Sequence, residues 1–216
     1  MKILNTEQTR AWDAFTIRHE PITSLDLMNR ASQVFTDWLV GLYPDTRRPV
    51  AVFAGTGNNG GDGMVVARML HWLNYEVKVF VCDLSGKRSP DFDAQLPVMP
   101  DDIDIRYIQN PDNLTDINLP RNVLIIDALF GSGLTRPLEG DWLRVVSFLN
   151  EMPGEIVSID LPSGLFADRA TPGQGVVRAT RTFSFESPKL AFFFPENAGR
   201  VGEWAFGSIG LHLDYY

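Results

Sequence analysis

The sequence is poor in the residues that form covalent cross-links or zinc sites. It contains one cysteine, Cys82, and three histidines among 216 residues. A single cysteine excludes an internal disulfide framework and a cysteine-cluster zinc site, and it fits a reducing, cytoplasmic compartment. The histidines are His19, His71 and His212. They lack the spacing of zinc ligands, so we expect them to pack or to lie at the surface.

Long apolar runs and an excess of positive charge are also missing. No run approaches the ~20 apolar residues needed to cross a bilayer, and the N-terminal MKILNTEQTRAWD is too polar for a signal peptide. Lysine and arginine total 19 against 27 aspartates and glutamates, a net charge of −8. Such a chain repels phosphate backbones at long range. We therefore expect no membrane partner and no nucleic-acid partner.

The chain does have enough apolar material for one core. Hydrophobic residues make up 44% of the sequence and charged residues 21%, both ordinary for a globular protein. No internal repeat, low-complexity tract or linker divides it. We expect a single domain over residues 1–216 that needs neither disulfides nor a structural metal for its stability.

Short, unbroken apolar runs alternate with helical patterns from residue 50 onward. The runs at 50–54, 77–82, 123–126 and 156–159 predict strands, and the periodicity at 64–73 and 142–149 predicts helices. Continuous hydrophobicity indicates burial on both faces, as in a parallel sheet between two helical layers. The repeated strand–helix–strand pattern predicts a doubly wound, Rossmann-like α/β fold.

Both ends of the chain predict further elements. Amphipathic segments at 5–20 and 22–43 predict helices beside the main sheet, capped at or just after Asn5 and Thr23. Late strands are expected near 183–185 and 204–206, the second antiparallel at a sheet edge. Residues 84–121 contain five prolines, which break any long element there.

A glycine-rich segment joins the first predicted strand to the first predicted helix of the alternating region. Residues 55–63 read GTGNNGGDG, in which Gly55, Gly57 and Gly60 satisfy G-x-G-x-x-G. Glycines at this place let backbone N–H groups approach a phosphate at the helix N-terminus. As a dehydrogenase fingerprint, the loop would pair with Asp83 as the ribose-binding acid.

Side-chain oxygens in the same loop favour a different ligand. Asn58, Asn59 and Asp62 are amide and carboxylate groups, the ligand type that a hard cation prefers. A carboxylate at a helix start also competes with a pyrophosphate for the same donors. For Asp62, a plain helix cap is the structural alternative to a ligand-binding role.

The third and fourth predicted strands also end in polar side chains, Asp127 and Asp160, each followed by a glycine-containing loop. The carboxyl ends of parallel strands share one edge of the sheet, where ligands bind. We therefore expect a shared site there. Its expected members are Asn58, Asn59, Asp62, Asp127, Asp160 and Ser163. Asn59, Asp127 and Ser163 would make an oxygen cage for a weakly hydrated cation.

Three common catalytic patterns do not occur. Without G-x-S-x-G, a serine hydrolase lacks its nucleophile elbow. The sequence G-x-x-x-x-G-K-[ST] is also absent, which argues against a P-loop NTPase. No Y-x-x-x-K pair is present to act as the catalyst of a dehydrogenase.

The three loops together resemble the YjeF N-terminal domain family, the NAD(P)H-hydrate epimerases. The matching motifs are GTGNNGGDG at 55–63, DALFGSGLTRPLEG at 127–140 and SIDLPSGL at 158–165. The segment at 187–211 resembles the C-terminal portion of that family, so the likeness covers nearly the whole chain. Residue 166 is Phe where the family often has Asp. The resemblance implies a Rossmann-like three-layer α/β/α sandwich with a mainly parallel central sheet.

The resemblance also implies repair of damaged nicotinamide cofactors. Such an enzyme interconverts the R and S epimers of NADH or NADPH hydrate, the 6-hydroxy forms, ahead of an S-specific, ADP- or ATP-dependent dehydratase. The resemblance implies that this dehydratase is either a separate protein or a fused domain, and the family is commonly dimeric. The implied potassium ligands are Asn59, Asp127 and Ser163. The implied substrate-binding residues are Asn58, Asn59, Gly60, Gly61, Asp62, Gly131, Ser132, Gly133, Leu134, Thr135, Arg136, Pro137 and Asp160.

Epimerisation at C6 requires the hydroxyl to leave and return, which needs an acid and a base. Asp160, at a strand end among glycine loops, is the candidate for this role. Lys189 could balance charge or transfer a proton, or it could be a surface lysine. A non-catalytic nucleotide-binding scaffold of the same fold is the alternative function. The aromatic residues of the first two helices, Trp12, Phe15, Phe35 and Trp38, could supply the interface of a homodimer.

Overall fold

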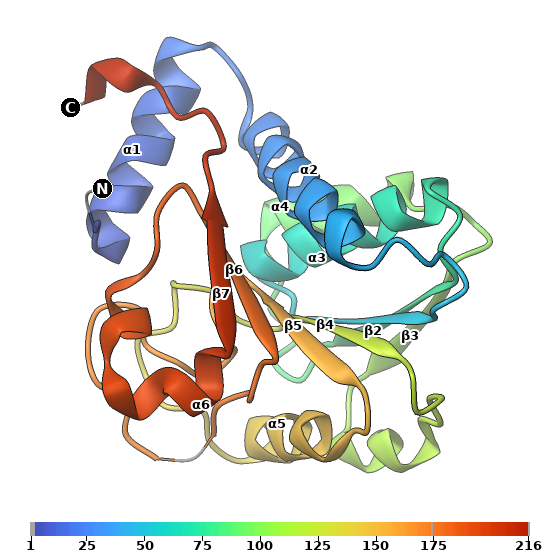
Figure 1. Cartoon of the computed structure of the whole chain (residues 1–216). Coiled ribbons are helices and arrows are strands. Elements are labelled where there is room, and N and C mark those ends of the chain that lie inside the picture. The colour runs from blue at the N-terminus through green and yellow to red at the C-terminus, as the bar shows by residue number, and fades with distance from the viewer. Residues whose placement is uncertain (1–2, 174, 216) are drawn as a thin grey trace.

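A parallel sheet of seven strands organises the computed structural model, which describes residues 3–173 and 175–215 (Figure 1). The strands are β1 (Val50–Ala54), β2 (Val77–Cys82), β3 (Asp104–Ile108), β4 (Leu124–Ala128), β5 (Glu155–Ile159), β6 (Arg181–Phe185) and β7 (Glu203–Gly207). Their order is β3-β2-β1-β4-β5-β6-β7. Strands β1 to β3 are added toward one edge of the sheet, and β4 to β7 are added toward the other edge. The order therefore reverses between β1 and β4, and such a switch point opens a crevice at the carboxyl ends of the strands.

Helices cover both faces of the sheet, as the unbroken apolar strands predict. The helices are α1 (Thr6–His19), α2 (Ser24–Leu42), α3 (Asn58–Trp72), α4 (Pro90–Gln95), α5 (Asp141–Glu151) and α6 (Ala198–Val201). On one face Val50 and Val52 join the core beneath α2, α3 and α4, and on the other Ala51 and Phe53 join the core beneath α5. The three-layer α/β/α sandwich is confirmed. Within the described residues, no helix combines the length and apolarity needed to cross a membrane.

The two edge strands differ from their predictions. β7 lies at the sheet edge as expected, but it pairs with β6 in parallel, so the expected antiparallel orientation is wrong and every strand pair described is parallel. At the other edge, β3 lies in the proline-rich region where no strand was predicted. Its side chains are mostly half-buried or exposed, and an exposed edge strand carries no continuous apolar run.

α3 begins at Asn58, well before the predicted start at Met64. Glycine disfavours helix interiors, so helix propensity predicts a loop for GNNGGDG. Its glycines instead allow the first turns to touch the sheet. A Cβ on Gly60 would lie 1.8 Å from the carbonyl oxygen of Gly55, and one on Gly63 would lie 2.5 Å from Cβ of Ala128. Asp62 therefore lies inside the helix, and its alternative as a helix cap is wrong.

The first helix does not pack beside the sheet as expected. α1 has the predicted cap at Asn5, but its Trp12 joins a separate apolar cluster with the C-terminal segment, including Ile209 and Leu211 (Figure 1). His212 closes this contact, because its carbonyl accepts a hydrogen bond from Trp12 Nε1 at 2.7 Å. The position of α1 therefore depends on a long-range contact. Its apolar face packs against the C-terminal segment instead of against the sheet.

The same packing corrects the expected dimer interface. Trp12 is 8% exposed and Phe35 is fully buried within its own chain. Trp38 also packs against the main core, with its ring 4.8 Å from that of Phe183. Trp12 and Phe35 therefore stabilise the monomer and are not a free surface for a second copy, whereas Phe15 and Trp38 are half-buried.

Candidate active site

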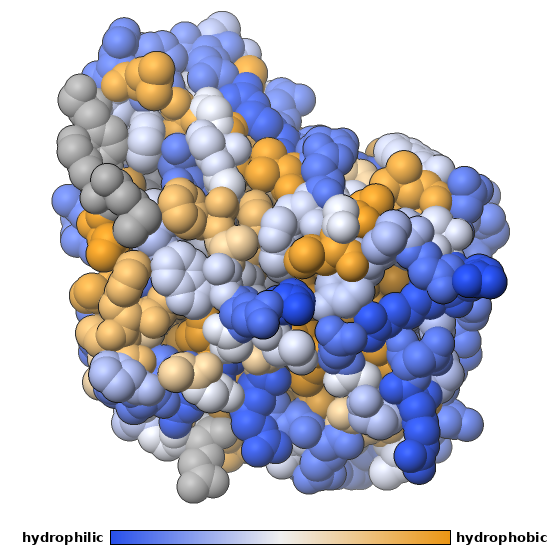
Figure 2. Space-filling model, in the orientation of Figure 1, coloured by the Kyte–Doolittle hydropathy of each residue, from blue (hydrophilic) through white to orange (hydrophobic). Residues whose placement is uncertain are grey.

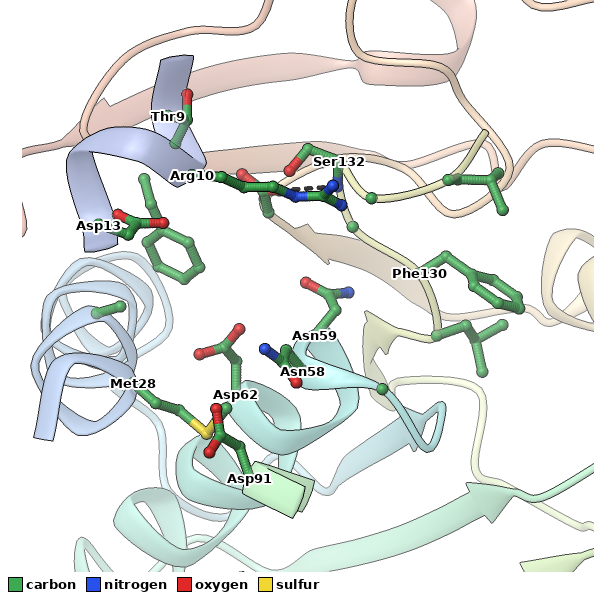
Figure 3. Close-up of a pocket in the computed structure, with 18 of the residues that line it drawn as sticks. Thr9, Arg10, Asp13, Met28, Asn58, Asn59, Asp62, Asp91, Phe130 and Ser132 are labelled. Carbon is green, nitrogen blue, oxygen red and sulfur yellow. Dashed lines mark hydrogen bonds between the residues drawn. The ribbon is translucent and has the colours of Figure 1, made fainter. Parts of the chain in front are cut away.

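A cavity of about 740 Å³ lies at the carboxyl edge of the sheet. Its walls come from α1, α2, the start of α3, and the segments that follow β1, β2, β4, β5 and β6 (Figure 3). The volume falls in the range of roughly 300–1,000 Å³ typical of small-molecule sites. The cavity therefore occupies the place where a doubly wound sheet binds its ligand.

Most of the predicted substrate-binding residues line this cavity. The lining includes Asn58, Asn59, Asp62, Gly131, Ser132, Gly133, Leu134, Thr135, Arg136, Asp160 and Lys189. Gly60 and Gly61 are buried behind it, where a Cβ on Gly61 would lie 2.7 Å from Cε of Met28. Pro137, Asp127 and Ser163 are also not among its lining residues. The structure thus brings the three predicted loops together. Most of the predicted residues line the cavity, and the buried residues among the others lie behind the lining.

One wall of the cavity was not foreseen. α1 contributes Thr9, Arg10 and Asp13, and the turn after β6 contributes Glu186. The i, i+4 spacing of Thr9 and Asp13 puts both on one face of the helix, but nothing in the sequence shows that this face meets the strand ends. In Figure 3, Asp13 faces the cavity from α1, on the side opposite Asn58.

Asp160 and Lys189 form an ion pair in the cavity wall. Nζ of Lys189 lies 3.1 Å from Oδ1 of Asp160, and Lys189 is only 3% exposed. Oδ2 of Asp160 accepts a hydrogen bond from the backbone N–H of Ser132 at 3.0 Å. Burial alone would raise the pKa of Asp160, but the charge of Lys189 and the Ser132 N–H hold it below its ordinary value. Asp160 is therefore an ionised carboxylate at neutral pH.

Backbone strain accompanies this acid. Asp160 has φ of +64°, and a hydrogen bond joins N of Leu161 to O of Ile159 at 2.7 Å, which forms a γ-turn. Glu186, directly after β6, has φ of +61° and the same kind of turn. Adjacent strands thus end in matching strained turns with an acidic residue at the centre of each. Strain of this kind persists where the surroundings impose it, commonly at functional sites.

Asp127 and Ser163 form a buried polar network behind the lining. Oγ of Ser163 donates to Oδ1 of Asp127 at 2.5 Å, and Oγ of Ser158 donates to Oδ2 at 2.7 Å. Burial raises the pKa of Asp127, and its hydrogen bonds lower it in part. Among the described residues, no lysine or arginine pairs with this carboxylate. A bound cation would supply the missing positive charge.

Asn59 lies beside the loop that follows β4, which also contacts Ser163. Its Oδ1 lies 2.9 Å from the position of a Cβ on Gly131, next to Phe130, whose carbonyl oxygen is 3.1 Å from Oγ of Ser163. Nδ2 of Asn59 is buried without a hydrogen-bond partner among the described residues. Turning the amide over would put its oxygen there, and an unpartnered oxygen suits a cation. Carboxylate, amide, hydroxyl and carbonyl oxygens are the donors of a hard cation, so these residues fit one.

Two further acids in the cavity have raised pKa values. Burial raises the pKa of Asp62 well above its ordinary value, and the negative charge of Asp160 adds to the effect. Burial raises the pKa of Asp13 to about 6, with Lys189 opposing the shift. Clustered carboxyl groups with opposite pKa shifts are typical of acid–base sites.

Asp83, which a dehydrogenase of this fold would use to bind the ribose, does not line the cavity. Asp83 accepts hydrogen bonds from Nη2 of Arg88 at 2.7 Å and from N of Gly86 at 3.2 Å. Asp83 is 8% exposed and is not among the residues that line the cavity. Its carboxylate therefore orders its own loop.

The fold and the cavity define a Rossmann-like α/β protein with a cavity lined by acidic side chains at the switch point of its sheet. More specifically, the chain belongs to the family described as YjeF-related protein N-terminus, whose model matches residues 24–191. The family assignment from the three motifs is thus confirmed.

Named relatives agree with this membership. An NAD(P)H-hydrate epimerase of Limosilactobacillus fermentum is 35% identical over 201 residues, covering 92% of this chain and 93% of its own. An enzyme of the same name from Limosilactobacillus reuteri is 32% identical over 199 residues, covering 92% and 90%. A bifunctional NAD(P)H-hydrate repair enzyme of Dictyoglomus turgidum is 29% identical across 99% of this chain, which spans 41% of that longer protein.

A solved structure has the same fold. The crystal structure of the yeast protein YNL200c superposes with a TM-score of 0.79, covering 100% of this chain and 92% of the yeast chain. Its sequence identity is 24%, so this likeness bears on the fold alone.

Proposed function

We propose that this chain is an NAD(P)H-hydrate epimerase, which interconverts the R and S epimers of the 6-hydroxy forms of NADH and NADPH. The observation that carries the proposal is the buried Asp160–Lys189 pair in the wall of the cavity formed by the three family motifs. Relatives that bear this name match the chain over almost its whole length, which supports the same activity here.

The cavity offers distinct surfaces to the two ends of such a substrate. The first helical bond of α3 runs from N of Gly61 to O of Gly57, so the N–H groups before it have no partner within the helix. These groups form a ready site for a phosphate. Arg10 and Arg136 also line the cavity, and Nη2 of Arg10 lies 2.9 Å from the position of a Cβ on Gly133. In this proposal they bind the diphosphate, while the reduced ring lies against Asp160.

Asp160 acts as acid and base in this proposal. The ring nitrogen expels the C6 hydroxyl as its lone pair forms a carbon–nitrogen double bond. Water then adds to C6 from the other face, and its excess proton passes to a base. The Asp160 carboxylate is held ionised by Lys189 and Ser132, so it takes that proton as a base and then returns it as an acid to the hydroxide that left. Lys189 stabilises the charge and fixes the carboxylate in place.

A potassium ion is the second part of the proposal, with Asn59, Asp127 and Ser163 as its ligands. Two observations support it: the buried carboxyl group of Asp127 has no lysine or arginine partner among the described residues, and the amide nitrogen of Asn59 has no hydrogen-bond partner there. The ion would balance the charge of Asp127 and order the loops that these residues belong to. It carries no step of the reaction.

Three further features belong to the proposal. An S-specific dehydratase is the natural partner, since a relative from Dictyoglomus turgidum is a bifunctional repair enzyme.

A homodimer is supported by apolar side chains exposed around the edge strand β7, namely Phe193 (44%), Trp204 (38%) and Phe206 (42%) (Figure 2). The single buried Cys82 supports a cytoplasmic location.

Incubation with a purified single epimer of the hydrate tests the proposed function. The R and S forms are separated by liquid chromatography at successive times. The proposal predicts that either epimer reaches the same R:S mixture without oxidation of the ring. If the folded chain binds the hydrate but the epimers interconvert only at the uncatalysed rate, the protein is instead a non-catalytic scaffold.

A further inference from the structure

Asp13 differs from the other acids that line the cavity, because its carboxylate makes no hydrogen bond or ion pair with any described residue. The other acids each have a protein partner: Ser32 for Asp62, Ser24 for Asp91, Lys189 and Ser132 for Asp160, and Ser208 and Ile209 for Glu186. In Figure 3, Asp13 faces the cavity from α1. Its carboxyl group is thus available to a ligand, while those of its neighbours are already engaged.

The chemistry of epimerisation requires two groups. The hydroxyl leaves from one face of the ring and the water returns to the other, so the proton donor and the proton acceptor have to lie on different sides of C6. Asp160 reaches the cavity from the end of β5, whereas Asp13 reaches it from α1, which caps the cavity away from the sheet. The two carboxyl groups therefore come to the cavity from different walls.

We propose that Asp13 is a second catalytic residue of the epimerase, the partner of Asp160 on the opposite face of the hydrate ring. This inference rests on the proposed function. In one direction, Asp13 donates its proton to the C6 oxygen. The C6–O bond breaks, the lone pair of the ring nitrogen forms the C=N bond, and water leaves.

In the second half of the reaction, a water oxygen bonds to C6 from the opposite face. The C=N electron pair returns to the ring nitrogen, and the extra proton of that water passes to Asp160. The net result is the other epimer and one proton moved from Asp13 to Asp160, which returns through solvent before the next turnover. The reverse reaction uses the same groups in the opposite order.

The charges around the two carboxyl groups agree with these roles. Burial raises the pKa of Asp13 to about 6, so it keeps a proton at higher pH than an exposed aspartate does. Lys189 beside Asp160 instead keeps that acid ionised. Two carboxyl groups whose surroundings separate their pKa values can divide the work of acid and base. The charged groups that act on Asp13 or share its cavity wall are Lys189, Asp160, Glu186, Asp62 and Arg10.

Asp13→Asn tests the inference, with Glu7→Gln as the matched control. Both changes remove one carboxylate from α1, but Glu7 is exposed and does not line the cavity. We expect Asp13→Asn to lower kcat by about 10²–10⁴-fold, as for loss of a general acid, with calorimetric binding of NADP little changed. The fall in wild-type kcat as the pH rises past about 6 should also disappear in Asp13→Asn. Glu7→Gln should match the parent in both respects.

Different outcomes separate the two proposals. If the parent equilibrates the epimers and Asp13→Asn stays within about threefold of its kcat, Asp13 is not catalytic and the proposed function stands. Loss of NADP binding with an unchanged kcat would make Asp13 a binding residue and overturn its catalytic role. If the parent itself does not equilibrate the epimers, the proposed function fails, and the role of Asp13 fails with it.

Discussion

Nζ of Lys189 lies 3.1 Å from Oδ1 of Asp160 in the wall of the cavity, with Lys189 3% exposed. Neither charge has free access to water, so each needs the other. The lysine belongs to the segment after β6 and the aspartate follows β5 directly. The pair therefore joins two neighbouring strand ends and fixes a carboxylate that lines the cavity.

Lys189→Met should leave Asp160 buried without its counter-charge. Near neutral pH we expect the free energy of unfolding to fall by about 3–5 kcal/mol, the range for breaking a buried pair. The pKa of Asp160 is lowered in the fold, so the pair stabilises the protein above the unfolded pKa of about 4 and less as the pH falls through the folded value.

Denaturant unfolding at several pH values checks this prediction. The difference between parent and Lys189→Met should shrink toward pH 4, because Asp160 then takes up a proton in the variant. The double variant Asp160→Asn/Lys189→Met should be less destabilised at neutral pH than Lys189→Met. If the difference in free energy of unfolding between parent and Lys189→Met is the same at every pH, lost packing rather than lost charge is the cause.

Asp13 should have the opposite effect on stability. Its pKa is about 6 in the fold and about 3.9 when unfolded, so the folded state binds more protons between these values. Its contribution to stability therefore falls as the pH rises from about 4 to about 6. Asp13→Asn should unfold at higher denaturant concentration than the parent above pH 6, by on the order of 1–3 kcal/mol. A destabilised Asp13→Asn at pH 7 would contradict this account of its environment.

The two adjacent asparagines at the start of α3 give a matched pair for the cation. Asn59 is half-buried with an unpartnered amide nitrogen, whereas Asn58 is exposed. We expect Asn59→Ala to weaken binding of potassium or thallium(I) at least about tenfold, because it removes one oxygen ligand of the cage. Asn58→Ala should leave it unchanged. Titration calorimetry and anomalous scattering from rubidium-soaked crystals measure this, and equal effects of both substitutions would count against the site.

Two helical glycines should respond to alanine in opposite ways. A Cβ on Gly60 would lie 1.8 Å from the carbonyl oxygen of Gly55, whereas one on Gly41 in α2 meets nothing within 4 Å. Gly60→Ala should cost at least about 1–3 kcal/mol through overpacking. Gly41→Ala should gain roughly 0.5–1 kcal/mol through helix propensity. Thermal unfolding of both variants decides this, and a neutral Gly60→Ala would show that α3 can move away from β1.

The parts of the structure that the sequence predicts are those set by local pattern. β1 and β2 match their apolar runs because both faces of these strands are buried. Asp160 was identifiable because a parallel sheet brings its strand ends to one edge. The sequence does not predict that α3 begins at Asn58, because the close approach of its glycines to the sheet is a tertiary contact.

The parts that the sequence does not predict depend on distant segments. Lys189 was a candidate for balancing charge, but its burial against Asp160 depends on the sharp turn at Glu186, where an acidic residue adopts positive φ. Asp13 reaches the cavity because α1 is held at one end by Asp168 and Ser132 and further along by the C-terminal segment around His212. Neither long-range contact leaves a local pattern, so the place of Asp13 in the cavity becomes visible only in the structure.

Epimerisation of pure R and pure S hydrate by the parent and by Asp160→Asn tests the central claim most directly. Proton NMR of the C6 position follows each reaction, and Asp101→Asn, at an exposed site, is the control for the same chemical change. The account predicts that the parent and Asp101→Asn reach one R:S ratio from either side. Asp160→Asn should be about 10²–10⁴-fold slower while still binding NADP. Turnover by Asp160→Asn within about threefold of the parent would contradict the account.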